Sequence, residues 1–172
     1  MLHSILGFSH DDLIEPIAVA VNNDDEVLIA DNGVGSILVF ESCGKLKKKI
    51  GTKGKGKGEF KELSSVCIGP AGEIIVADTS RIIVFSPSGD KVLTEIGGAA
   101  AGRGRFCGVS VDRHGHLLAA KMEKTKSYIQ VRGRTVAKQG SVPANVYRMY
   151  LRLSQRVSNR TEKHQMNDEG IA

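Results

Sequence analysis

Lysine and glycine alternate in the segment Gly51-Thr-Lys-Gly-Lys-Gly-Lys57, the part of the chain most suggestive of phosphate chemistry. As far as its lysine, the segment fits a P-loop, in which backbone N–H groups and a lysine surround nucleotide phosphates. Gly58 stands where that motif needs serine or threonine, and Gly58-Glu-Phe60 cannot start the helix whose N-terminus faces the phosphate. We therefore expect a glycine-rich loop without nucleotide hydrolysis.

Histidines and carboxylates elsewhere form no catalytic set. His114 and His116 straddle a turn with no third ligand near them, so we expect turn histidines and no metal site. Asp31 and Asp78 each end a short apolar run, where an aspartate can accept backbone N–H bonds and fix a turn. We interpret both aspartates as structural, and we expect no catalytic residue, no cofactor and no enzymatic activity.

Composition and charge limit the location and the partners. The 172 residues carry a net charge of +5, which permits an acidic or nucleic-acid partner. Cys43, Cys67 and Cys107 follow no zinc-site spacing, and Cys67 lies in an apolar run that predicts a buried thiol. The sequence shows neither a secretory signal nor an apolar stretch of ~18 residues. We therefore expect a cytoplasmic protein without membrane contact.

Landmarks recur along the chain at a nearly constant step. The glycine-rich loop from Ile50 to Phe60 has a second copy from Ile96 to Phe106. Ile29-Ala-Asp31 likewise recurs as Val76-Ala-Asp78. A period of roughly 40 to 50 residues is typical of radial or stacked repeat folds. The glycines of both loops are thus explained by the repeat.

Short apolar runs separated by turn signals predict four strands in each repeat. This pattern predicts an all-β fold, a partial β-propeller of two to three four-stranded blades. The expected strands are 17–21, 26–30, 37–40 and 45–50, then 65–68, 73–77, 82–85 and 91–96, and finally 109–111, 116–120, 128–131 and 134–137.

The expected organisation is a lead-in over residues 1–13, blades over about 14–62, 63–106 and 107–140, and a tail over 141–172. Within the tail, Val146, Met149, Leu153 and Val157 have helical spacing, which predicts a helix near 145–156. The polar remainder is expected to be disordered.

The repeats resemble the NHL repeat. Gly72-Glu-Ile-Ile-Val-Ala-Asp-Thr79 followed by Arg81-Ile-Ile-Val-Phe85 carries the likeness best, and Pro16–Asp31 with Ile37–Phe40 carries it in the first repeat. Two departures are Val34-Gly-Ser36, which replaces the usual Asn-Arg, and Lys121, which stands where the family has aspartate.

The resemblance implies a propeller like that at the substrate-recognition end of tripartite-motif ubiquitin ligases. Such propellers usually close with about six blades, so we expect further blades or another chain to complete this arc. The ligases carry a RING domain ahead of the propeller, and three scattered cysteines cannot supply its zinc ligands.

Strand parity places the loops after second strands and the linkers after fourth strands at one end of the blades. That end is expected to be basic and to bind RNA or a protein partner, with the alternative that its lysines only solvate a flexible linker. The candidate binding residues are Lys53, Lys55, Lys57, Lys61, Arg81, Arg103 and Arg105.

Two functions therefore stay open. The favoured one is a non-enzymatic interaction module, and the other is a metal-dependent propeller hydrolase or lyase. The latter would need His, Asp, Glu or Asn pointing inward from several blades, and Ile17–Val21 and Ser65–Ile68 offer almost none.

Overall fold

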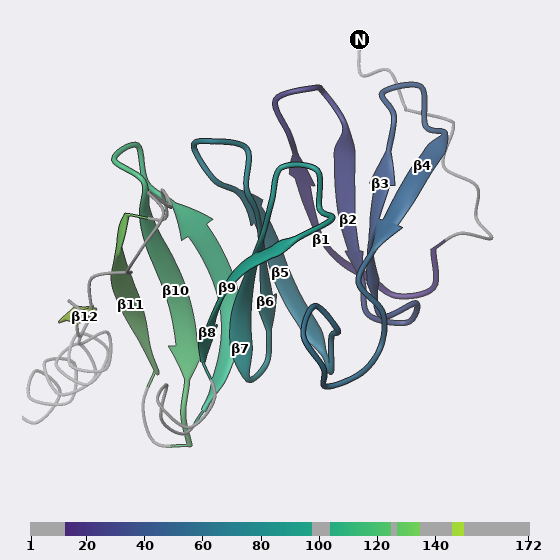
Figure 1. Cartoon of the computed structure of the whole chain (residues 1–172). Helices are drawn as coiled ribbons and strands as arrows, with labels where there is room; N and C mark the ends of the chain where they lie inside the picture. Colours follow the sequence, from purple (N-terminus) through teal and green to yellow (C-terminus); the bar gives the residue numbers. More distant parts are fainter. Residues whose placement is uncertain (1–12, 98–103, 125–126, 135–145, 150–172) are drawn as a thin grey trace, which may run out of the picture.

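The computed structural model of the protein describes residues 13–97, 104–124, 127–134 and 146–149. These residues form three four-stranded antiparallel sheets that stand side by side in chain order (Figure 1). The expected all-β partial propeller is thereby confirmed. Within the described ranges, no helix has the length and apolar character needed to cross a membrane.

Each sheet is one blade, with its strands paired in chain order. The first blade contains β1 (Pro16–Val21), β2 (Val27–Asp31), β3 (Ser36–Phe40) and β4 (Leu46–Ile50). The second contains β5 (Leu63–Ile68), β6 (Ile74–Asp78), β7 (Arg81–Phe85) and β8 (Val92–Gly97). The third contains β9 (Arg105–Val111), β10 (His116–Met122), β11 (Ser127–Arg134) and β12 (Val146–Met149).

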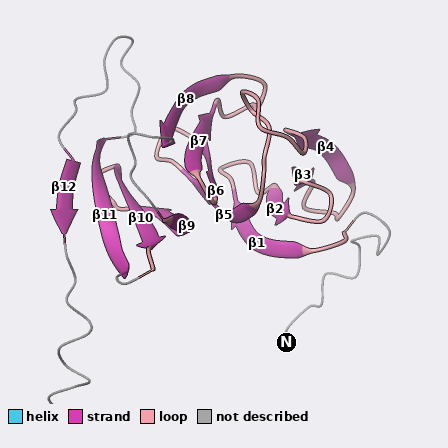
Figure 2. Ribbon diagram, turned by 90° about the horizontal axis from the view of Figure 1, so that it is seen from below, coloured by secondary structure: helices cyan, strands magenta, loops and turns pink. Residues whose placement is uncertain are grey.

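The first strands of the three blades are neighbours, since β1 packs against β5 and β5 packs against β9. Figure 2 shows the second blade between the other two. One apolar core fills the space between the first and second blades, around Leu28, Ile37, Val76 and Phe85. Another fills the space between the second and third blades, around Ile75, Val84 and Leu117.

The sequence of each strand matches how far the strand is buried. The middle strands β3 and β6 are buried along their whole length, and their apolar, β-branched sequences suit a surface covered on both faces. At the edge of the first sheet, β4 alternates exposed lysines with Leu46, Lys48 and Ile50. The turn between first and second strands uses a positive φ in each blade, at Asp25 (59°), Gly72 (85°) and Gly115 (80°).

The predicted strands of the first two blades agree with the observed ones to within two residues at each end. The third blade differs, because β11 extends to Arg134 and the fourth strand is β12. Arg134, which was expected to begin the fourth strand, is the last residue of β11, and the other residues of the expected strand over 134–137 lie outside the described ranges.

The expected helix near 145–156 is also wrong for Val146–Met149, which pair with Ile129–Arg132 of β11. The apolar spacing in this segment is helical, but the unpaired backbone of β11 offers hydrogen bonds that a short helix cannot match. The remaining residues of that prediction, and the predicted disorder after it, lie outside the described ranges.

Candidate functional site

One end of the blades gathers the turns that follow second strands and the linkers that follow fourth strands. The Oγ of Ser36 donates a hydrogen bond to the carbonyl of Gly51 (2.9 Å), which joins residues 31–36 to the linker 51–62. The N–H of Phe106 donates to the carbonyl of Thr79 (2.9 Å), which joins 78–81 to the third blade. We call these segments, with Gly104 and Arg105, the loop end. Strand parity predicted the same grouping.

The linker between the first two blades is closed by its own hydrogen bonds. The N–H of Phe60 donates to the carbonyl of Thr52 (2.7 Å), and the N–H of Gly54 donates to the carbonyl of Phe60 (2.9 Å). The Glu59 carboxylate accepts from the N–H of Gly56 (2.7 Å). The ring of Phe60 is buried edge-on to Phe85, with 5.9 Å between ring centroids. The linker is therefore anchored to the core at Phe60.

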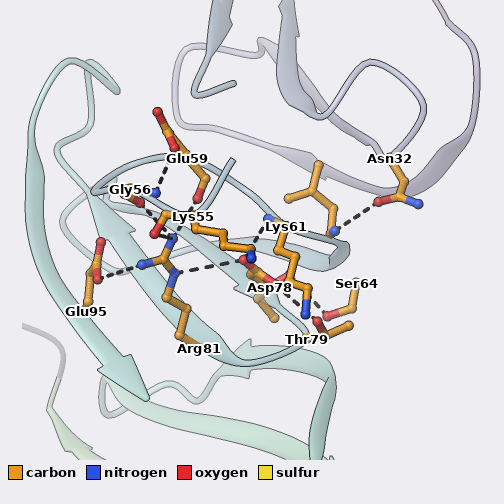
Figure 3. A network of polar contacts seen from close by, with 12 residues as sticks. Asn32, Lys55, Gly56, Glu59, Lys61, Ser64, Asp78, Thr79, Arg81 and Glu95 are labelled. Carbon is orange, nitrogen blue, oxygen red and sulfur yellow. Dashed lines mark hydrogen bonds and ion pairs between the residues drawn. The ribbon is translucent and has the colours of Figure 1, made fainter. Parts of the chain in front are cut away.

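Arg81 holds this linker from the second blade, as Figure 3 shows. Its Nη2 donates to the carbonyls of Gly56 (2.8 Å) and Glu59 (3.0 Å). Its Nη1 pairs with Glu95 (3.1 Å), and its Nε lies 3.9 Å from the Asp78 carboxylate. The guanidinium of Arg81, a predicted binding residue, is thus used inside the protein.

Asp31 is fully buried at the end of β2 and receives backbone N–H groups. Ile14 (2.7 Å), Glu15 (3.0 Å) and Val34 (2.9 Å) donate to its carboxylate. Burial alone would raise its pKa, but the backbone donors together outweigh burial and lower the pKa below its usual value. The carboxylate therefore fastens the start of β1 to the turn after β2.

Asp78 occupies the same place in the second blade and is also fully buried. It accepts from the N–H of Lys61 (2.9 Å) and the hydroxyl of Thr79 (3.3 Å). A neighbouring contact links the blades, because the Asn32 side-chain oxygen accepts from the N–H of Leu63 (3.1 Å). Figure 3 shows Asn32 reaching from the first blade toward this junction.

The four lysines of the linker, in contrast, are exposed. They are Lys53, Lys55, Lys57 and Lys61. Arg105, at the start of β9, is exposed as well. Arg103, the remaining predicted binding residue, lies outside the described residues. The loop end thus combines a bonded interior with an exposed set of cations.

The third blade departs from the first two at Lys121, which has the place of Asp31 and Asp78. Lys121 is 2% exposed, and its Nζ lies 5.3 Å from the centroid of the Phe106 ring. A lysine over an aromatic face is attracted by the ring quadrupole. The third blade therefore fills the anchor position with a cation and a ring.

The other sequence motifs have structural settings. The linker leads into β5, so it lacks the helix N-terminus that a P-loop uses. His116 Nδ1 lies 2.8 Å from the Asp112 carboxylate, which also accepts the N–H groups of His114 and His116. These bonds, led by the one from the backbone of His116, lower the pKa of Asp112 to about 2. Among the described residues, no three His, Cys, Asp or Glu side chains group as metal ligands.

Sequence reasoning missed the contacts of Arg81, Asn32 and Glu59 with backbone atoms. No motif marks such contacts, because they depend on how blades approach each other. One signal was available for the opposite end of the blades. Asn22 and Asp112 stand at equivalent turn starts, and both accept two backbone N–H groups across the turn.

Solved structures similar to this chain are β-propeller proteins. A Bacteroides fragilis protein is 22% identical with a TM-score of 0.61, and the match covers 74% of this chain and 38% of that one. A catalytically inactive virginiamycin B lyase from Staphylococcus aureus, solved with quinupristin, is 15% identical with a TM-score of 0.61, over 86% of this chain and 44% of the lyase. A luciferin-regenerating enzyme is 15% identical with a TM-score of 0.56, over 76% and 48%.

This chain therefore spans less than half the length of these proteins, and the likeness shows the fold alone. No curated protein sequence matches it significantly. A family model described as "6-bladed beta-propeller" matches residues 9–99, more than half of the chain. These residues include the first two blades with the linker and both aspartate anchors. The protein belongs to this family of six-bladed β-propellers.

Proposed function

We propose that the chain is a non-enzymatic interaction module that binds an acidic partner through the lysines of the loop end. One observation carries the proposal. Lys53, Lys55, Lys57 and Lys61 are exposed on a linker whose backbone is held by its own hydrogen bonds and by Arg81. A loop held in this way presents its cations without a large loss of conformational entropy on binding.

RNA is the partner that this surface suits best. Lysines bind phosphates as point charges, and such binding weakens steeply as salt displaces the protein from the polyanion. The aromatic side chain of the linker, Phe60, is buried and cannot stack on a base. Affinity would therefore come from phosphate contacts, with little sequence preference.

The resemblance to NHL repeats supports a binding role, since that propeller is the substrate-recognition end of tripartite-motif ligases. Ligase activity itself would come from a RING domain. Such a module would act in the cytoplasm, and an acidic protein segment is the second partner to test.

The alternative proposal is a metal-dependent propeller hydrolase or lyase. A lyase and a luciferin-regenerating enzyme share the fold, and that likeness is its support. Metal analysis of the purified protein separates the two proposals. One bound ion per chain would favour the enzyme and count against the binding module.

Binding of fluorescent mixed-sequence RNA tests the proposal directly. The variant Lys53→Gln/Lys55→Gln/Lys57→Gln should lose at least about tenfold in affinity at low salt, because three phosphate contacts are removed. A matched control, Lys45→Gln/Lys91→Gln/Arg113→Gln, removes the same charge from exposed turns at the opposite end of the blades. Equal RNA affinity of the two variants would overturn the assignment. If the linker variant instead loses affinity for an acidic peptide and keeps its affinity for RNA, the partner is a protein.

A further inference from the structure

Among the described residues, no neighbour covers an apolar strip on the face of the first blade that is turned away from the second blade. Ile17, Val19 and Val21 alternate along β1 on this face and are all exposed, Val19 by 64%. Their neighbours Ala18 and Ala20 point the other way, into the core between the first two blades. Three exposed β-branched residues on one strand are unusual for a surface strand and mark a contact face.

The strand register shows what this face matches. Val19 pairs with Ile29, and Ile29 pairs with Leu38, as Val66 pairs with Val76 and Val76 with Ile83. Continuing this alignment, Val19, Val21, Ile29, Leu38 and Phe40 occupy the places of Val66, Ile68, Val76, Ile83 and Phe85 in the second blade.

In the second blade, those residues form its contact with the first blade. Val66 is consequently 5% exposed, whereas Val19 in the same place is 64% exposed. On the first blade, Ile29, Leu38 and Phe40 are already buried with Leu13 and Val34. The part that the described residues leave exposed is therefore the β1 strip, made of Ile17, Val19 and Val21. Neighbouring blades of this chain meet through their first strands.

The third blade carries the opposite kind of face. Leu118, Ala120 and Ile129 have the register places of Leu28, Ala30 and Ile37, with which the first blade contacts the second. On the same face, the first strand of each blade carries small residues. They are Ala18 and Ala20 in the first blade and Gly108 and Ser110 in the third.

We propose that a second copy of this chain docks on the β1 strip. The third blade of the second copy packs on the first blade of the first copy in the way that, within one chain, the first blade packs on the second. By symmetry, the third blade of the first copy then covers the β1 strip of the partner. The two interfaces continue the packing already present between the blades of one chain. Two copies of the three blades that the structure describes make six, the number in the description of the family.

Light scattering coupled to size exclusion measures the state of the purified chain. A dimer of twice 18.5 kDa, about 37 kDa, is expected. A monomer at micromolar concentration, or a mass above that of a dimer, overturns the proposal.

Two variants locate the interface. Val19→Glu changes one end of the arc and Ala120→Lys changes the other, and each should convert the dimer to a monomer. Val19 is exposed within one chain, so glutamate there leaves the fold intact, and circular dichroism checks this. The control Leu93→Glu alters an exposed apolar residue of the middle blade and should remain dimeric.

Mixing the two monomeric variants supplies a sharper result. A pair made of one Val19→Glu copy and one Ala120→Lys copy has one unaltered interface and one with opposite charges. The mixture should therefore recover a species of dimer mass, which neither variant forms alone. A dimer that survives Val19→Glu, or a mixture that stays monomeric, contradicts the proposed docking.

Discussion

Two groups of charged side chains share the loop end and are used differently. Asp31, Asp78 and Arg81 are directed into the protein, where they bind backbone N–H and C=O groups. Lys53, Lys55 and Lys57, on the linker that Arg81 holds, are exposed. The aspartates recur with the repeat, whereas these lysines belong to the first linker alone. The two aspartates and Arg81 therefore hold the blades together, whereas the linker lysines are the residues that we propose to bind a partner.

The third blade shows that the fold does not need an aspartate at the end of every second strand. At the place of the two aspartates it has Lys121, buried over Phe106. Two different chemistries thus occupy one position of the fold. Lys121 also keeps the register of the aspartates, since it pairs with Phe106 as Asp78 pairs with Leu63.

The largest effect is expected from Asp31→Ala. It leaves the part-buried N–H groups of Ile14, Glu15 and Val34 without their acceptor, and a fully buried unsatisfied donor costs about 1–3 kcal/mol. After relaxation, we expect the free energy of unfolding in urea to fall by about 3 kcal/mol. The control Asp24→Ala alters an exposed turn carboxylate and should stay within ~0.5 kcal/mol of the parent. Equal stability of both variants would refute the anchor.

A smaller effect is expected from Lys121→Ala. The variant loses the attraction to the Phe106 ring and part of the packing, together about 1–2 kcal/mol. Urea unfolding again measures it, with Lys124→Ala as a control at an exposed position nearby. A loss larger than that of Asp31→Ala would reverse the ranking of the two anchors.

Acid should weaken the aspartate anchor selectively. The folded-state pKa of Asp31 is lowered, so its carboxylate stabilises the fold fully above its unfolded pKa of about 3.9. That stability is lost as pH falls through the lower folded pKa. The difference in unfolding free energy between the parent and Asp31→Asn should therefore shrink from pH 7 to pH 2. A difference independent of pH would show that the charge of Asp31 contributes nothing.

The smallest effect on stability is expected from the linker lysines. Lys53→Gln/Lys55→Gln/Lys57→Gln changes exposed side chains and should leave the free energy of unfolding within ~0.5 kcal/mol of the parent. Urea unfolding of this variant beside Asp31→Ala completes the comparison. A loss of 2 kcal/mol or more would mean that the lysines also build the scaffold.

The sequence was sufficient for the fold wherever the repeat is regular. Turn residues and alternating apolar runs predicted the eight strands of the first two blades, because each local preference there agrees with the sheet. The sequence also predicted that Asp31 and Asp78 lie at the ends of second strands. The grouping of the loops at one end followed from strand parity alone.

The rest depended on contacts between distant segments. β12 pairs with β11 although its residues have helical spacing, so tertiary pairing overrides the local pattern. Arg81 looked like a free cation in the sequence, and only the approach of the linker reveals its carbonyl partners. In the sequence, β1 likewise looks like any other first strand, because its exposure depends on whether another blade packs against it.

The salt dependence of RNA binding tests the proposed role of the linker lysines most directly. A plot of log affinity against log salt for single-stranded RNA has a slope of about −0.7 per neutralised phosphate. Removing Lys53, Lys55 and Lys57 should therefore make the slope shallower by about 2 units. The control variant Lys45→Gln/Lys91→Gln/Arg113→Gln should keep the parent slope. Equal slopes for the parent and the linker variant would contradict the account.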